Sequence, residues 1–345
     1  MTPIEVGILG ATGVVGQQFV ARLERHPWFR PTWLAASERS EGRQYRAIAP
    51  WRLPTPIPGG IGDQTVEACI PGRGPKVVFS ALDASAAGDI EPAFAAAGHI
   101  VVSNARNYRM DPLVPLLIPE VNADHLAILP EQRAAKGWPG AIVTNPNCST
   151  VVLAMALAPL RLFGIRAVIV STMQAVSGAG YPGVPSLDIL GNIVPFIGGE
   201  EEKMETETLK ILGSDGGRMP YEALVSAHTN RVPVIDGHTM TVSVDLEARP
   251  ELAEIAEALR TFRGRPQELA LPSAPVPPIE LLLEPGRPQP RLDADRGDGM
   301  TVSVGRLRPC PVTHCKFVAL GHNTVRGAAG AAVLNAELMA AERLI

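Results

Sequence analysis

A glycine-rich turn near the N-terminus constrains the fold of this chain more than any other feature. Residues 4–9 form a short apolar run, the sequence GATGVVG follows at residues 10–16, and residues 14–24 have the pattern of a helix. Glycines at Gly10, Gly13 and Gly16 permit a tight turn and let a pyrophosphate approach the backbone at the helix N-terminus. The sequence therefore predicts a strand–turn–helix unit that binds a dinucleotide. The alternative is a turn that binds nothing.

The same alternation of strand and helix continues through the first third of the chain. Residues 32–36, 76–82 and 99–103 are short apolar runs, and the alanine-rich residues 84–97 between the last two have helical character. Strands that are apolar on both faces and separated by helices are typical of a parallel sheet covered on both sides. We predict an α/β fold with a Rossmann-type, doubly wound first domain.

The second half of the chain has a different periodicity. Residues 239–247 (TMTVSVDLE) alternate strictly between apolar and polar side chains, and residues 300–304 repeat this pattern. Such strands are typical of an antiparallel sheet with one polar face. Residues 252–263 predict a charged helix, residues 271–299 a long irregular excursion and residues 325–344 an amphipathic helix. The second domain is thus predicted to be α+β, with a mixed or antiparallel sheet.

Composition excludes several classes of function. The net charge is −4 and no basic run is interleaved with aromatic residues, so we expect no nucleic-acid partner. No uncharged apolar stretch approaches the length of a membrane span, and the N-terminus lacks the pattern of a signal peptide. Only four cysteines are present, and they are scattered. We therefore expect a cytoplasmic protein without a disulfide framework and without a membrane partner.

One cysteine lies where a thiol becomes reactive. Cys148 stands in the sequence TNPNCST, directly before the apolar run of residues 151–160, which reads as a buried helix. Ser149 and Thr150 are good helix N-cap residues. A cysteine at a helix N-terminus lies beside free backbone N–H groups and the positive end of the dipole, and both favour the thiolate. The alternative is a small buried core residue.

Polar groups on three other segments could complete a site around Cys148. Arg231 and His238 lie in NRVPVIDGHT before the alternating strand, Gln174 follows a strand at residues 167–170, and Arg109 follows the strand at residues 99–103. Loops at strand ends commonly carry catalytic groups, and a guanidinium can bind a carboxylate with two hydrogen bonds. The alternatives are a structural histidine and surface ion pairs.

The segment after the second strand bears on the choice of nicotinamide cofactor. Glu38 favours NAD, because an acidic residue binds the free ribose, whereas Arg39 and Arg43, with Ser37 and Ser40, favour the 2′-phosphate of NADP. We predict NADP. The alternative is a solvated charged loop.

Polar residues near the C-terminus have side chains that could bind a metal ion. Cys310, His314, Cys315 and His322 are all candidate zinc ligands. Their spacing is not C-x-x-C, and the neighbours His314 and Cys315 would point to opposite faces of a strand. We predict no metal.

Six motifs in this order resemble the aspartate-semialdehyde dehydrogenase family, and most closely its archaeal and fungal type. They are GATGVVG, TNPNCST, TMQAVSGAGYPG, GGEEEKMETETLKIL, NRVPVIDGH and GHNTVRGA. The resemblance implies an NADP-binding domain at residues 1–135, completed by the C-terminal helix at 325–345. It also implies a catalytic and dimerisation domain at residues 136–324.

The resemblance also implies roles for individual residues. Cys148 matches the nucleophile that forms an acyl-thioester and His238 the acid/base. The residues that match substrate-binding positions are Gln174, Arg231, Arg109 and the E-x-x-K pair Glu207 and Lys210; Glu200 with Lys203 shares that spacing, and Glu201 is a further candidate. The residues that match NADP contacts are Gly10, Thr12, Gly13, Val14, Val15, Ser37, Arg39, Ser40, Ser177, Gly178 and Asn323.

The activity implied is NADPH-dependent conversion of L-4-aspartyl phosphate to L-aspartate 4-semialdehyde and phosphate, by a homodimer or homotetramer. Two alternatives remain at this point. One is a malonyl-CoA reductase, which resembles the archaeal type and reduces a CoA thioester. The other is a non-catalytic NADP-sensing regulator on the same fold.

Overall fold

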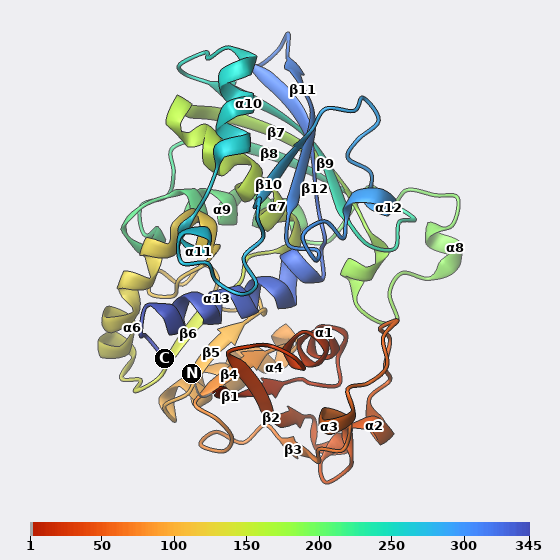
Figure 1. Ribbon diagram of the computed structural model, residues 1–345, viewed down its shortest axis with the longest axis vertical. Coiled ribbons are helices and arrows are strands. Elements are labelled where there is room, and N and C mark those ends of the chain that lie inside the picture. The colour runs from red at the N-terminus through yellow and green to blue at the C-terminus, as the bar shows by residue number, and fades with distance from the viewer. Residues whose placement is uncertain (1–2) are drawn as a thin grey trace.

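A computed structural model describes residues 3–345 as two sheets joined by helices (Figure 1). The first sheet has the strand order β3-β2-β1-β4-β5-β6 and every pairing in it is parallel. Its strands are β1 (Ile4–Leu9), β2 (Phe29–Ala36), β3 (Val66–Ala68), β4 (Val77–Ser80), β5 (Ile100–Ser103) and β6 (Ala141–Thr144). This is the order of a doubly wound nucleotide-binding sheet, so the predicted Rossmann-type fold is confirmed.

The first sheet is covered by the predicted helices and by shorter ones. They are α1 (Val14–Leu23), α2 (Tyr45–Ile48), α3 (Gly59–Gly62), α4 (Ala84–Ala96), α5 (Pro119–Asn122) and α6 (Leu129–Lys136). Because β6 belongs to this sheet, the sheet continues past residue 135, where the sequence placed the end of the first domain. The chain then leaves β6 at Thr144 and begins α7 (Cys148–Leu157) only four residues later.

The second sheet is mixed, with the strand order β10-β11-β12-β9-β7-β8. Its strands are β7 (Ile165–Gln174), β8 (Leu224–Arg231), β9 (His238–Leu246), β10 (Ile279–Leu282), β11 (Val302–Pro309) and β12 (Cys315–Gly321). The pairs β7–β8 and β10–β11 are parallel and the others antiparallel. In β9, Met240, Val242, Val244 and Leu246 are buried and Thr241 is exposed, as the alternation predicts.

One face of the second sheet packs on α7, which is buried along nearly its whole length, and on α9 (Glu200–Leu212). The remaining helices here are α8 (Ser186–Ile189), α10 (Leu252–Thr261), α11 (Arg265–Glu268) and α12 (Pro290–Asp293). Strand β10 and helix α12 lie in residues 271–299, so the prediction of an irregular excursion there was partly wrong. Periodicity misses elements of four residues because they are too short to display it.

The C-terminal segment lies between the two sheets (Figure 1). It begins as a π-helical turn (Val325–Ala329) and continues as α13 (Gly330–Ala341). Val325, Leu334 and Leu338 pack in the same core as Ile8 and Phe79 of the first sheet. Every residue from 325 to 339 is buried, so the predicted amphipathic pattern was wrong: a helix enclosed between two sheets has no solvent face.

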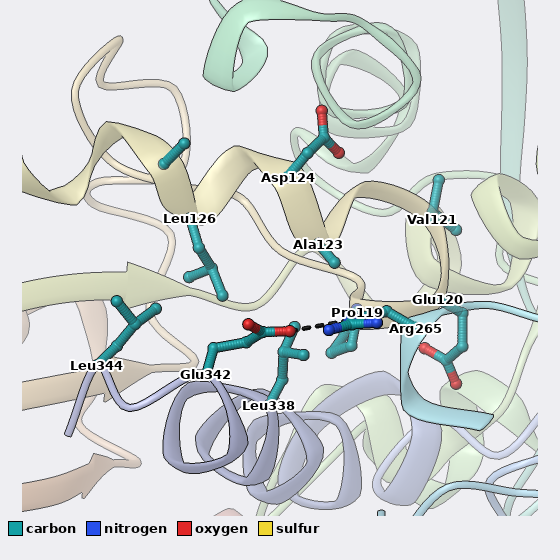
Figure 2. A pocket seen from close by; sticks show the side chains of 11 residues that line it. Pro119, Glu120, Val121, Ala123, Asp124, Leu126, Arg265, Leu338, Glu342 and Leu344 are labelled. Atoms are coloured by element: carbon teal, nitrogen blue, oxygen red, sulfur yellow. Dashed lines mark hydrogen bonds and ion pairs between the residues drawn. The ribbon is translucent and has the colours of Figure 1, made fainter. Parts of the chain in front are cut away.

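Helix α13 ends beside a pocket of about 580 Å³ (Figure 2). Leu126, Leu338 and Leu344 are among the residues that line it. The ion pair between Arg265 and Glu342, with an N–O distance of 2.8 Å, crosses the pocket and ties the C-terminal segment to α11.

Candidate active site

The first residue of α7 is Cys148 itself. The N-cap is Asn147, whose Oδ1 accepts hydrogen bonds from the N–H groups of Ser149 at 2.9 Å and Thr150 at 3.2 Å. The prediction of Ser149 or Thr150 as the cap was therefore wrong, because both lie inside the helix. Asn147 is a residue that sequence reasoning missed, although asparagine is among the preferred N-cap residues. Its cap places the thiol in the first turn, at the positive end of the helix dipole.

His238 faces this thiol from the first position of β9. Its Nε2 lies 3.2 Å from Cys148 Sγ, and the backbone N–H of Ala175 donates a 3.1 Å hydrogen bond to its Nδ1. A nitrogen that accepts from a backbone N–H carries no proton, so the neutral ring carries its proton on Nε2. The N–H of His238 therefore points at the sulfur. This hydrogen bond is strongest when the sulfur is a thiolate.

Burial keeps both groups uncharged at neutral pH. Burial, followed by the positive charge of Arg231, lowers the pKa of His238 to about 3. Burial, followed by the negative charge of Glu200, raises the pKa of Cys148 to about 12, against the opposing effects of Arg109, Arg231 and the Ser149 N–H. The cations around the site therefore favour the thiolate, and burial opposes it.

The depressed pKa of His238 predicts an acid-sensitive fold. Below pH 6.5 the unfolded chain binds a proton at this histidine, and the folded chain does not until about pH 3, so stability falls as the pH is lowered across this window. Between pH 7 and pH 5 this residue should account for about 2 kcal/mol of the lost free energy of unfolding. Urea unfolding of the native chain and of His238→Gln at both pH values measures this loss in the free energy of unfolding. Equal losses in the two proteins would contradict the prediction.

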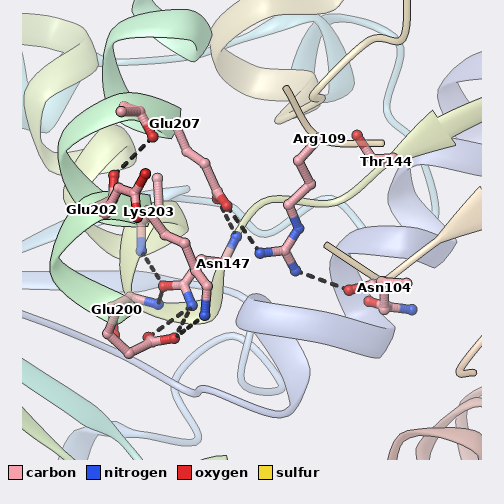
Figure 3. Close-up of polar contacts among 12 residues, drawn as sticks. Asn104, Arg109, Thr144, Asn147, Glu200, Glu202, Lys203 and Glu207 are labelled. Carbon is pink, nitrogen blue, oxygen red and sulfur yellow. Dashed lines mark hydrogen bonds and ion pairs between the residues drawn. The ribbon is translucent and has the colours of Figure 1, made fainter. Parts of the chain in front are cut away.

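Two glutamates of α9 hold the start of α7 in place (Figure 3). Glu207 Oε2 accepts the backbone N–H of Asn147 at 2.6 Å, and its Oε1 accepts from Arg109 Nη1 at 3.0 Å. Glu200 accepts from Asn147 Nδ2 at 2.9 and 2.8 Å, from Gln174 Nε2 at 3.2 Å and from Lys203 Nζ at 2.9 Å. Burial raises the pKa of Glu200, but Lys203 and these hydrogen bonds outweigh it, so the pKa lies below its usual value.

The two E-x-x-K pairs of α9 have different surroundings. Lys210 Nζ donates to the backbone carbonyls of Arg109, Asp111 and Val114 at 2.7, 2.8 and 3.0 Å. An ammonium group has three N–H donors, so Lys210 has none left for a phosphate oxygen. Lys203 donates one hydrogen bond, to Glu200. The geometry thus favours Glu200 and Lys203 over the predicted pair Glu207 and Lys210.

The remaining candidate of this segment, Glu201, is also used within the fold. Its Oε1 accepts the backbone N–H of Thr229 at 3.0 Å and so ties α9 to β8.

Arg231 and Gln174 each keep unused hydrogen-bonding capacity beside the dyad of Cys148 and His238. Arg231 is 7% exposed, donates from Nη1 to the Ala175 carbonyl at 2.7 Å, and forms no ion pair within residues 3–345. Gln174 Oε1 is buried without a hydrogen-bond donor in the same part of the chain. A methyl group on Gly178 would lie 3.0 Å from Arg231 Nη1 and from His238 Cε1, so glycine there keeps this space open.

A cleft of about 1150 Å³ lies at the carboxyl edge of the first sheet. Gly10 has a φ of +73°, and a methyl group on Gly16 would lie 2.2 Å from the Gly10 carbonyl oxygen, so the turn needs both glycines. No side chain caps α1, which leaves its N-terminus available to a phosphate. The predicted cofactor residues that line this cleft are Gly10, Thr12, Gly13, Val14, Val15, Ser37 and Arg39.

The other predicted cofactor residues lie elsewhere. Ser40 ends a 3₁₀ turn (Glu38–Ser40) beside the cleft. Asn323 donates to Ser177 Oγ at 2.7 Å and accepts the Gly237 N–H at 2.9 Å, next to His238. Ser177, Gly178 and Asn323 are thus gathered at the dyad. Gly180 and Tyr181, which follow Gly178 closely in the chain, line the cleft. They therefore connect the nucleotide cleft to the residues around Cys148 and His238.

Within residues 3–345 no three acidic, histidine or cysteine side chains are grouped to hold a metal ion, and this includes Cys310, His314, Cys315 and His322. In the same range no helix has the length and apolar character needed to cross a bilayer.

Known proteins resemble this chain along its whole length. Residues 5–129 match the family model described as semialdehyde dehydrogenase, NAD binding domain, and residues 157–326 match semialdehyde dehydrogenase, dimerisation domain. The chain is 50% identical to the aspartate-semialdehyde dehydrogenase of Methanothermobacter thermautotrophicus, over 97% of this chain and 99% of the relative. The chain belongs to the aspartate-semialdehyde dehydrogenase family.

Other members of the family lead to the same assignment. The enzyme of Archaeoglobus fulgidus is 50% identical over 99% of both chains. A crystal structure of aspartate-semialdehyde dehydrogenase with NADP from Candida albicans superposes with a TM-score of 0.91 at 44% identity, covering 99% of this chain and 100% of that one. The family resemblance and the fold class expected from the sequence are confirmed.

Proposed function

We propose that this protein is an NADP-dependent aspartate-semialdehyde dehydrogenase that reduces L-4-aspartyl phosphate to L-aspartate 4-semialdehyde and releases phosphate. The observation that carries this proposal is the 3.2 Å contact between Cys148 Sγ and His238 Nε2 at a helix N-terminus. The contact occurs in a chain 50% identical to enzymes of that name. Such reductions belong to amino-acid biosynthesis, in the routes to lysine, threonine and methionine.

Cys148 begins the reaction as the nucleophile. Its sulfur attacks the acyl carbon while the thiol proton passes to an oxygen of the departing phosphate, the carbon–oxygen bond to phosphate breaks, and a thioester forms between Cys148 and the aspartyl group. NADPH, when bound in the cleft at the first sheet, supplies the hydride that reduces this thioester. The Nε2–H of His238 protonates the oxyanion of the resulting thiohemiacetal. His238 then takes that proton back as the carbon–sulfur bond breaks, which frees the aldehyde, and the released sulfur regains its own proton from solvent.

Charged groups around the dyad match the charges of the substrate. Arg231 has no carboxylate partner within residues 3–345, which fits a role in binding the α-carboxylate. Arg109 and Lys203 are cations for the phosphate, and Glu200 is the anion for the substrate amine. Gln174, whose Oε1 has no donor, orients the substrate near the sulfur. Glu207 and Lys210 instead shape the site by holding Asn147 and the loop after Arg109.

An assay in the direction of oxidation tests the substrate. With NADP, phosphate and L-aspartate 4-semialdehyde, the purified protein should produce NADPH. Malonate semialdehyde with CoA serves as the control for a malonyl-CoA reductase. NADPH formed only with the control pair would replace the aspartyl assignment, and none with either would favour a regulator.

The cofactor preference should depend on Arg39. This side chain and Ser37 line the cleft, where they suit the 2′-phosphate of NADP. Arg39→Ala should raise KM for NADP about 10-fold or more and leave KM for NAD nearly unchanged, because a charge-assisted hydrogen bond contributes about 1.5–3 kcal/mol. Steady-state kinetics with both cofactors measure this. An equal change for both would show that Arg39 does not contact the 2′-phosphate.

We propose further that two copies associate through the outer face of the second sheet. Ile169 and Met173 of β7 and Leu224 of β8 expose apolar side chains there, and the matching family model is described as a dimerisation domain. Light scattering should then give a mass at least twice 36.6 kDa. We place the enzyme in the reducing cytoplasm, where a thiol nucleophile stays reduced.

A further inference from the structure

A buried ion pair lies behind the dyad. Arg326 Nη1 and Nη2 donate to the two carboxylate oxygens of Glu120, each at 2.7 Å, and both side chains have no exposed surface. The two residues are 206 positions apart in the chain. Arg326 belongs to the π-helical turn and Glu120 to α5. The pair therefore fastens the C-terminal segment to the first half of the molecule.

The chain next to Arg326 packs directly on one face of α7. A methyl group on Gly327 would lie 2.6 Å from Cys148 Cβ, and one on Gly321 would lie 2.7 Å from Val152 Cγ2. Arg326 Nη2 itself lies 3.1 Å from Met155 Sδ. Positions 148, 152 and 155 are on one face of a helix, because they follow the i, i+4, i+7 spacing. Residues 321–328, which we call the backing segment, thus fix α7 at three points, and the first is the nucleophile.

The backing segment also reaches the other member of the dyad. Asn323 Oδ1 accepts the N–H of Gly237, the residue before His238, at 2.9 Å, and its Nδ2 donates to Ser177 Oγ at 2.7 Å. One short stretch of chain therefore bears on both Cys148 and His238. Its position helps to determine the distance between sulfur and imidazole.

Arg326 has little freedom to move. A methyl group on Gly264 would lie 2.5 Å from Glu120 Cα, so the backbone that carries Glu120 is itself tightly enclosed. Figure 2 shows Glu120 next to Arg265 at one end of the pocket. The Nε–H of Arg326 is buried without an acceptor among residues 3–345. A buried ion pair is weak evidence for stability, because the cost of desolvating the two charges offsets their attraction. A π-helical turn is also a feature that occurs frequently at functional sites.

We propose that Arg326, held by Glu120, is a positioning residue that sets the geometry of Cys148 and His238 through the backing segment. This inference rests on the proposed function, because it assumes that the dyad performs the chemistry. In this proposal Arg326 contacts neither the substrate nor the cofactor. Its effect passes through Gly327 to the nucleophile and through Asn323 to the acid/base.

Glu120→Gln tests the proposal, with Glu337→Gln as the matched control. Glu337 is also fully buried and hydrogen-bonded, since His26 Nε2 lies 2.7 Å from its Oε1 and the backbone N–H of Ser273 donates to its Oε2 at 3.0 Å, and it lies on α13. Both variants should lose stability. Only Glu120→Gln should lower kcat, by about 10- to 100-fold with little change in KM, because small misplacements of reacting groups have effects of this size. Arg326→Lys keeps the charge but not the two-point contact, so its kcat should lie between those of the native chain and Glu120→Gln.

Alkylation of Cys148 by iodoacetamide between pH 6 and pH 10 provides the second readout. Per folded molecule, Glu120→Gln should change the rate and its pH profile, whereas Glu337→Gln should match the native chain. If Glu120→Gln does not fold, the double variant Glu120→Leu with Arg326→Met removes the ion pair without leaving a buried charge unpaired. It should show the same loss of kcat.

Native kcat and alkylation in a folded variant without the ion pair would overturn the positioning role. The proposed function would survive that result if Cys148→Ser were inactive. Conversely, an active Cys148→Ser would overturn the function itself, whatever Glu120→Gln does. The two failures are thus distinguishable.

Discussion

Replacing Cys148 with serine should lower turnover by about 10⁴-fold or more while leaving NADP binding intact. Serine keeps the size and the hydrogen bond to His238, but a hydroxyl is a far weaker nucleophile than a thiolate at neutral pH. The nucleotide cleft is lined by other residues, so the affinity for NADP has no reason to change. Steady-state rates with aspartate semialdehyde and fluorescence titration with NADPH measure the two effects separately.

Cys315→Ser is the matched control for this experiment. Cys315 is another free cysteine, and it is buried on β12, where it packs in the core of the second sheet. Its replacement should cost stability and leave turnover per folded molecule close to native. If Cys148→Ser retained native turnover, no thioester would form at this residue, and the covalent mechanism would be wrong.

Replacing His238 with glutamine should lower kcat by about 10²- to 10⁴-fold, the range usual for general acid–base catalysis. The Ala175 N–H fixes the ring proton on Nε2, which faces the sulfur and is positioned to protonate an oxyanion formed beside it. A glutamine amide donates a hydrogen bond but does not transfer its proton. The KM for the semialdehyde should change little, because Arg231, the proposed ligand of the α-carboxylate, is unchanged.

His125→Gln controls for the loss of any buried histidine. Burial lowers the pKa of His125 too, and it contacts Asn122 Nδ2 at 2.9 Å, within a segment that belongs to the first half of the molecule. We expect kcat of this variant to stay near native. Equal losses of kcat in the two variants would mean that His238 acts through the fold and not as the acid/base.

The parts of this molecule that the sequence predicted well are those encoded locally. The predicted strands of the first sheet, β1, β2, β4 and β5, are mostly apolar runs, and the glycine turn has its strand before and its helix after, so a window of about twenty residues carries the signal. The alternation of β9 is equally local. Cys148 was singled out from its neighbours for the same reason.

The E-x-x-K pairs of α9 illustrate what the sequence could not decide. Glu200 and Glu207 are seven residues apart, nearly two full helical turns, so they lie on almost the same face of the helix. Their positions along the helix axis differ by about 10 Å. The sequence does not show which of the two positions lies beside Cys148. The loop after Arg109, whose carbonyls engage Lys210, decides between them, and this loop comes from the other half of the chain.

Burial by distant segments explains the other failures. The C-terminal helix lost its predicted solvent face because two sheets enclose it, and Glu120 meets Arg326 across 206 positions with no pattern that connects them. Patterns within short stretches of sequence cannot predict an ion pair between residues so far apart in the chain. Only the packing of the C-terminal segment between the two sheets (Figure 1) brings these groups together.

The short connection from β6 to α7 has a mechanical consequence. The nucleophile is attached, four residues after Thr144, to the sheet that carries the nucleotide cleft, whereas Arg231 and His238 belong to strands of the other sheet. Helix α7 packs in the core of the second sheet, so Cys148 forms one unit with Arg231 and His238 at the end of this short connection. A rotation between the two halves would therefore leave the distance from sulfur to imidazole unchanged. It would move these three side chains together relative to the nucleotide cleft.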